Sequence, residues 1–169
     1  GKRNFFSMTS ITHTNEELRE LYQELILDHA RNPRHFGKLP DATHTAEGIN
    51  PLCGDKLKMY FHIDDDNCIS DACFEGSGCA ISIASASLLT DMVIGLDTDE
   101  ALKYFSKLLA RLTGGQFAGN ENTEDDIKLG KLMALEGVKE FPLRVKCATL
   151  AWHALKSAIH HELNPATTE

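Results

Sequence analysis

The sequence predicts an α+β domain in which a small three-stranded antiparallel sheet packs against about five to six helices. Three observations lead to this prediction. Strand-like alternation of apolar and polar residues is confined to residues 43–74, helical patterns occupy most of the chain on both sides of it, and no internal repeat is present. A run of strands followed by a block of helices is typical of a two-layer fold, with the helices on one sheet face.

The first expected helix covers residues 15–32. Thr14 and Glu17 have the spacing of a capping box, an apolar stripe at helical spacing follows, and Pro33 ends the helix. The period then changes to two over residues 57–63, which predicts a half-buried strand. The other two strands are expected on either side of it, over residues 43–49 and, after the polar turn 64–67, over residues 68–74.

Four more helices are expected after Gly78, over residues 80–94, 97–112, 126–135 and 142–162, with 116–126 as a polar loop. Gly95 suits the C-cap of the first of these helices. Asp97 and Glu100 have the capping-box spacing that opens the second. Pro142 suits the first turn of the last helix.

Length and composition limit the classes of protein that the chain can belong to. With 169 residues, one domain is expected over residues 11–163, with a disordered or cloning-derived leader over 1–10 and a C-terminal tail over 164–169. The net charge of −8 gives no basic face for nucleic acid. No apolar run approaches the roughly 18 residues that span a bilayer, and the leader lacks a secretory pattern. A cytoplasmic protein without a membrane partner is expected.

The residues best able to carry chemistry are three cysteines and one aspartate. In Cys53-Gly54-Asp55 the glycine permits a tight turn, so that both flanking side chains can converge. Cys79 directly precedes a predicted helix and Cys147 lies in the first turns of another, where the helix dipole should lower a thiol pKa. Three thiolates and one carboxylate suit a tetrahedral zinc ion, with the carboxylate as the more exchangeable ligand.

Other interpretations of the polar and sulfur-containing side chains stay open. Free cysteines are often small buried residues, and Cys79 and Cys147 can have that role alone. Cys68 and Cys73, on opposite faces of a predicted strand, are interpreted as structural thiols. The eight histidines have no metal-ligand spacing with the cysteines, and the acidic turn 64–66 lacks the EF-hand pattern.

Several motifs together resemble the U-type iron–sulfur cluster assembly family, which includes IscU-like and NifU N-terminal-like proteins. They are distributed over residues 16–159 and comprise Leu27–His29, Asn32–Gly37, Asn50–Asp55, Phe74–Ser82 and Arg144–Ala148. The resemblance implies a SufE/NifU-like two-layer fold and a pyridoxal-phosphate cysteine desulfurase as partner, which delivers sulfur as a persulfide. It also implies a surface metal site formed by Cys53, Asp55, Cys79 and Cys147.

Three departures favour the SufU-like branch of this family over the scaffold branch. Lys146 stands where the scaffold branch has a histidine, and residues 140–146 depart from its Leu-Pro-Pro-Val-Lys motif. The stretch between Cys79 and Cys147 is also longer than in that branch, with the polar segment 114–126 as the insertion. The SufU-like branch is associated with tightly held zinc and with a SufS-type cysteine desulfurase. Downstream iron–sulfur acceptor proteins are further expected partners.

The expected function is zinc-dependent transfer of persulfide sulfur, in partnership with the desulfurase rather than as an independent enzyme. Cys53 is the preferred sulfur acceptor because its glycine-containing loop can swing outward, and Cys147 is the alternative acceptor. Arg144 either supports the site or is an exposed residue at a helix start. One competing function is a scaffold that assembles a [2Fe–2S] cluster, or binds iron, through Cys53, Cys79 and Cys147. A purely structural zinc site is the other, disfavoured because no C-x-x-C pair is present.

Overall fold

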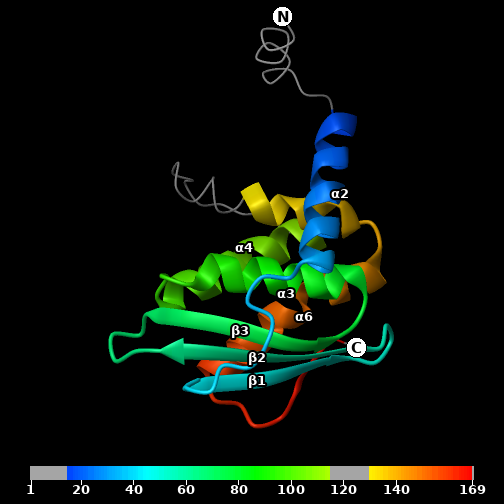
Figure 1. Cartoon of the computed structure of the whole chain (residues 1–169). Coiled ribbons are helices and arrows are strands. Elements are labelled where there is room, and N and C mark those ends of the chain that lie inside the picture. Colours follow the sequence, from blue (N-terminus) through cyan, green and yellow to red (C-terminus); the bar gives the residue numbers. More distant parts are fainter. Residues whose placement is uncertain (1–14, 115–129, 169) are drawn as a thin grey trace, which may run out of the picture.

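A four-stranded mixed sheet forms one layer of the computed structural model, which describes residues 15–114 and 130–168 (Figure 1). Three strands form an antiparallel meander, namely β1 (His44–Asn50), β2 (Asp55–Ile63) and β3 (Ile69–Ser77). The short strand β4 (Ala166–Thr167) lies parallel to β1, which gives the order β3-β2-β1-β4.

The fourth strand corrects the prediction of a purely antiparallel, three-stranded sheet. Gly48 pairs with Ala166 and Ile49 with Thr167, and the Thr168 N–H donates to the Ile49 carbonyl at 3.4 Å. Two residues are too few to show any alternation of apolar and polar side chains, so this strand has no signal in the sequence. Its position depends on the free edge of β1, which is a tertiary feature.

Besides an α-helical segment at 130–132, the described residues contain four whole α-helices and one 3₁₀ helix. They are α2 (Asn15–Arg31), α3 (Ala80–Val93), α4 (Thr98–Thr113), η1 (Met133–Val138) and α6 (Pro142–Ile159). The α+β class is therefore confirmed. The predicted helix 126–135 lies partly outside the described residues; in its described part, residues 130–132 are α-helical and 133–135 belong to the 3₁₀ helix. The last helix ends three residues before the predicted end, because His161 adopts a left-handed φ of 52°.

The predicted caps of α4 are confirmed, whereas the predicted Thr14 cap of α2 lies outside the described residues. The Asp97 carboxylate accepts the Glu100 N–H at 2.8 Å, and the Glu100 carboxylate accepts the Asp97 N–H at 3.0 Å. Gly114 ends the same helix with a left-handed φ of 79°. Capping chemistry is local, which is why the sequence alone could indicate it.

The core lies between one sheet face and the helices α3 and α6, with α6 on β1 and β2 and α3 on β3. Apolar side chains of β2 alternate into this core as predicted, and Trp152 of α6 is fully buried in the same core. Tyr60 is buried as well, although the alternation predicted it on the polar face; its hydroxyl donates to the Glu75 carboxylate. No helix in the described ranges is long and apolar enough to cross a membrane.

Candidate metal centre

One end of the molecule brings together three chain segments that are far apart in the sequence. The turn between β1 and β2, the start of α3 and the start of α6 lie on the same side of the fold (Figure 1). These segments carry the four residues that the sequence singled out, Cys53, Asp55, Cys79 and Cys147. The candidate centre therefore combines residues as far apart in the sequence as Cys53 and Cys147, which are 94 positions apart. The meander and the contact between α3 and α6 bring these segments together.

Cys53 lies in a tight turn and is partly exposed. Asn50 and Asp55 are paired across the β1–β2 ladder, so the turn between them is short. The Cys53 N–H donates to the Asn50 carbonyl at 3.3 Å, and Gly54 takes a left-handed φ of 72°. The turn depends on that glycine, since other residues adopt this φ at a cost. No helix holds Cys53 in place.

Three potential ligand atoms converge at this end of the fold. The sulfur atoms of Cys53 and Cys147 and a carboxylate oxygen of Asp55 all lie within 4.8 Å of one another. A tetrahedral zinc ion with bonds of about 2.0–2.3 Å places its ligand atoms roughly 3.5–4 Å apart. The three side chains therefore need only a small closure to share one ion, and this donor set fits zinc.

Cys79 borders these three residues, but it is not part of the group whose ligand atoms all lie within 4.8 Å of one another. It is the N-cap of α3, and its sulfur accepts the Ser82 N–H at 3.5 Å. Its own N–H donates to Asp55 Oδ1 at 2.8 Å. The Cys79 backbone is thus tied to the centre, while its thiol caps the helix as the sequence predicted from its position.

Asp55 is 1% exposed, yet its carboxylate is held in the ionised form. Burial pushes its pKa upward, but hydrogen bonds from the Cys79 N–H and from three side chains outweigh this effect, and the pKa lies below its usual value. The three side chains belong to Ser82, Cys147 and Asn50. A buried carboxylate with this support is ready to bind a cation.

The expectation of a lowered pKa for the Cys147 thiol is wrong. Burial, followed by hydrogen bonds with Cys53, Asp55 and Cys79, raises the pKa of the Cys147 thiol. Cys147 is the sixth residue of α6, which places it beyond the free N–H groups that stabilise anions at a helix start. A bound cation reverses this balance, since metal ions favour the thiolate.

Gly78 makes room for the Asp55 carboxylate. A Cβ at this position would lie 2.5 Å from Asp55 Oδ1 and 3.2 Å from the Asp55 Cα. Neither contact can be relieved without moving the aspartate, so only glycine allows β2 and the start of α3 to approach this closely.

Two buried polar residues beside the centre were not among the predicted site residues. Asn50 Nδ2 lies 3.3 Å from Asp55 Oδ2 and 3.5 Å from Cys147 Sγ, and the residue is fully buried. The Ser82 hydroxyl, also fully buried, donates to the Cys147 carbonyl at 3.4 Å. Both residues stand within motifs of the sequence, but which motif residues turn inward depends on the packing of β1, α3 and α6.

The remaining predicted residues lie outside this group. Arg144 is exposed at the third position of α6, and Lys146 is partly buried two residues later. Cys68 follows the β2–β3 turn and Cys73 lies within β3; both are partly buried. The structure therefore separates these two thiols from the other three cysteines.

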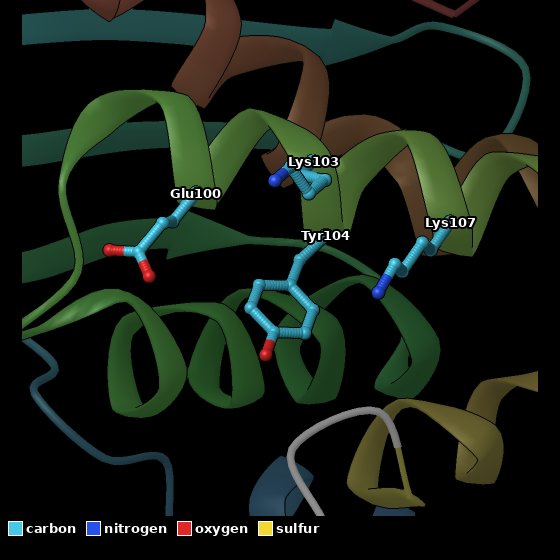
Figure 2. Close-up of a pocket in the computed structure, with 4 residues that line it drawn as sticks. All are labelled: Glu100, Lys103, Tyr104 and Lys107. Atoms are coloured by element: carbon cyan, nitrogen blue, oxygen red, sulfur yellow. The ribbon is translucent and has the colours of Figure 1, made fainter. Parts of the chain in front are cut away.

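A small pocket on α4 is unrelated to this centre. It is lined by Glu100, Lys103, Tyr104 and Lys107 (Figure 2). The Lys107 ammonium lies 5.4 Å from the centroid of the Tyr104 ring. Its lining contains no sulfur ligand, so the candidate chemistry of the described residues remains at the cysteine cluster.

The mixed sheet, the covering helices and the cysteine–aspartate cluster define a protein of the iron–sulfur assembly class. The family described as the NifU-like N terminal domain matches residues 21–148, and the chain belongs to this family. The predicted resemblance is thereby confirmed.

Individual relatives extend the similarity over most of the chain. The zinc-dependent sulfurtransferase SufU of Bacillus subtilis (strain 168) is 41% identical over 148 residues, covering 88% of this chain and 95% of the relative. The iron–sulfur cluster assembly scaffold protein IscU of Streptococcus pyogenes serotype M1 is also 41% identical, covering 88% of each chain. A crystal structure from Fervidobacterium islandicum AW-1, described as a candidate scaffold protein for the SUF system, superposes with a TM-score of 0.72. It is 35% identical and covers 80% of this chain and 94% of its own.

Proposed function

We propose that this chain is a zinc-dependent sulfurtransferase that accepts persulfide sulfur for iron–sulfur cluster assembly. The observation that carries the proposal is the convergence of two thiols and one carboxylate within 4.8 Å, with only Cys53 of the three partly exposed. The similarity to a zinc-dependent sulfurtransferase over 88% of the chain supports it. The proposed source of sulfur is a cysteine desulfurase of the SufS type.

In this proposal Cys53, Asp55, Cys79 and Cys147 would hold the zinc ion, which when bound would favour the thiolate form of the three cysteines. Cys79 joins the other three by turning its sulfur from the Ser82 N–H toward them. Asp55 remains ionised through its hydrogen bonds, and burial shields Cys147 from solvent. The chain thus protects the thiols until a sulfur donor arrives.

Cys53 is the proposed acceptor because, of the four proposed ligands, it alone combines partial exposure with a position in a glycine-containing turn. Its thiolate attacks the terminal sulfur of the donor persulfide, forming a new S–S bond on Cys53. The S–S bond of the donor breaks, and the donor cysteine leaves as a thiolate. The terminal sulfur has moved with no external oxidant or reductant.

Single-turnover transfer from a persulfide-loaded cysteine desulfurase tests this assignment, with the position of the added sulfur mapped by mass spectrometry. Cys53→Ser should lower the fraction of chains that gain 32 Da, the mass of one sulfur atom, at least about tenfold relative to the wild-type protein. Cys68→Ser is the matched control, since it removes a partly buried thiol outside the cluster. Undiminished acceptance by Cys53→Ser would show that another cysteine is the acceptor.

The second candidate function is a scaffold on which a [2Fe–2S] cluster is built. Equal identity to an IscU scaffold protein favours it, and three thiols with one carboxylate can hold such a cluster. Metal analysis after anaerobic purification, together with desulfurase stimulation by the zinc form, separates the two functions. Stimulation that appears only after zinc removal would support the scaffold instead.

A further inference from the structure

Within the described residues, the side chain of Asn50 lies within hydrogen-bond distance of both the Asp55 carboxylate and the Cys147 sulfur. Its Nδ2 lies 3.3 Å from Asp55 Oδ2 and 3.5 Å from Cys147 Sγ. The residue is fully buried at the end of β1 and pairs with Asp55 across the ladder. The ladder therefore fixes the backbone of Asn50 directly beside Asp55.

The amide chemistry matches two anionic neighbours. Nδ2 carries two N–H groups, so one can point at the carboxylate and the other at the sulfur. The reverse orientation would set an acceptor oxygen against both groups once they are ionised. Hydrogen bonds of this kind, made to metal ligands from behind, orient the ligands and tune the metal.

The other end of the same amide is unpaired. Asn50 Oδ1 is buried, and no described residue donates a hydrogen bond to it. An asparagine that served only to stabilise the β1–β2 turn would be expected to satisfy both ends, because an unpaired buried acceptor destabilises the fold. Here only the end that faces the centre is used.

Cys53 is held differently from these two residues. Its link to Asn50 is a backbone bond, from the Cys53 N–H to the Asn50 carbonyl, and its side chain stays partly exposed. The centre thus has a buried part, Asp55 and Cys147, held by the Asn50 amide, and an exposed part, Cys53, on a glycine-containing turn.

We propose that Asn50 is a positioning residue that keeps Asp55 and Cys147 fixed on the metal while Cys53 leaves it to accept sulfur. This inference rests on the zinc-dependent function proposed above. It assigns the Asn50 amide two roles, orienting the carboxylate and donating an N–H···S bond to the Cys147 thiolate. Neither role involves contact with the incoming sulfur.

Zinc affinity, measured by competition with a chromophoric chelator, gives the first test. Asn50→Ala should weaken zinc binding about 10- to 100-fold, the usual effect of removing a group that supports metal ligands. In the cobalt-substituted protein, the sulfur-to-cobalt charge-transfer band should also shift, because the sulfur loses its hydrogen bond. Thr90→Ala is the matched control, since it removes a fully buried side chain that hydrogen-bonds to the Ser87 carbonyl within α3.

Thiol alkylation of the zinc form tests the division of the centre into two parts. In the wild-type protein, Cys53 should react with iodoacetamide well before Cys147, whereas in Asn50→Ala the Cys147 rate should rise about tenfold or more. Peptide mass spectrometry reads both sites at once. A changed melting temperature with unchanged zinc affinity, cobalt spectrum and alkylation order would overturn the proposal and leave Asn50 a structural residue.

A measurement on the wild-type protein covers the case in which Asn50→Ala does not fold. With ¹¹³Cd in place of zinc, an N–H···S bond should produce a scalar coupling between cadmium and a side-chain amide proton of Asn50. Absence of that coupling in the folded, cadmium-loaded protein would overturn the inference. Failure of the wild-type chain to bind zinc at all would instead contradict the proposed function, so the two failures are distinguishable.

Discussion

This protein has two buried polar clusters, which differ in how far their polar groups find hydrogen-bond partners within the protein. At the junction of α2 and α3, His29 Nδ1 lies 2.7 Å from Ser87 Oγ, which also accepts the Arg34 N–H at 2.8 Å. At the surface beside this cluster, the Arg34 guanidinium pairs with Asp28 at 2.7 Å. At the candidate centre, by contrast, Asn50 Oδ1 is unpaired and Cys53 is partly exposed.

The difference indicates which of the two clusters stabilises the fold and which binds a ligand. In the His29 cluster, burial, followed by the charge of Arg34, lowers the pKa of His29, so the neutral ring is the form that fits. The Ser87 hydroxyl hydrogen-bonds to the His29 ring and to the Arg34 N–H, so these polar groups find their partners within the protein. The cysteine cluster brings two thiols and a carboxylate within 4.8 Å of one another, a donor set that suits a cation. Substitutions should therefore affect the two clusters in different measurements.

The largest effect is expected from Cys147→Ser. A structural zinc ion contributes about 10–16 kcal/mol over four ligands, so losing one thiolate should weaken zinc binding about 100-fold or more. Chelator competition measures the loss. Cys73→Ser, which removes a partly buried thiol of β3, should leave the affinity unchanged. Equal zinc affinities for the two variants would show that Cys147 is not a zinc ligand. The cysteine cluster would then not differ from the His29 cluster in binding a metal.

His29→Ala should have the converse effect. Removing the ring deletes the bond to the Ser87 hydroxyl inside the core, which should lower the free energy of unfolding by about 1–3 kcal/mol in urea titrations. Zinc affinity should stay within about threefold of the wild-type value, since it follows the cysteine cluster. A larger change in zinc affinity would show that the two clusters are energetically coupled through α3.

The same variant should change how stability depends on pH. The folded-state pKa of His29 is depressed, so its contribution is complete above the unfolded value of about 6.5 and is lost as the pH falls through the folded pKa. The wild-type protein should therefore lose more stability than His29→Ala on acidification below about pH 6.5. Parallel stability curves for the two proteins would contradict this.

Local chemistry explains what the sequence could predict about the fold. The capping box of Asp97 and Glu100 and the alternation along β2 depend on neighbouring residues, and both appear in the structure as expected. The strand β4 depends on an edge supplied by β1, more than 100 positions earlier, and two residues carry no pattern of their own. The presence of β4 therefore follows from the assembled sheet and not from the local sequence.

The candidate centre divides in the same way. Residue type, the glycine between Cys53 and Asp55 and the predicted helix starts selected Cys53, Asp55, Cys79 and Cys147. The structure brings all of these except Cys79 within 4.8 Å of one another. The same reasoning assigned Cys147 a lowered pKa, because helix position is readable from sequence and burial is not. Asn50 was missed for the same reason, since its role follows from the direction of a fully buried amide.

The smallest expected effect belongs to Arg144, which lies near the centre in sequence but is exposed on α6. Arg144→Ala should leave zinc affinity unchanged, because no metal ligand depends on it. The rate of sulfur transfer from the desulfurase should fall about two- to tenfold, mainly through slower association, and the difference should shrink at high salt, as expected for an exposed charge at a docking surface. Arg111→Ala is a control arginine on α4. Equal transfer rates for both variants at low salt would make Arg144 an ordinary surface residue and confine the functional part of this end to the cysteine cluster.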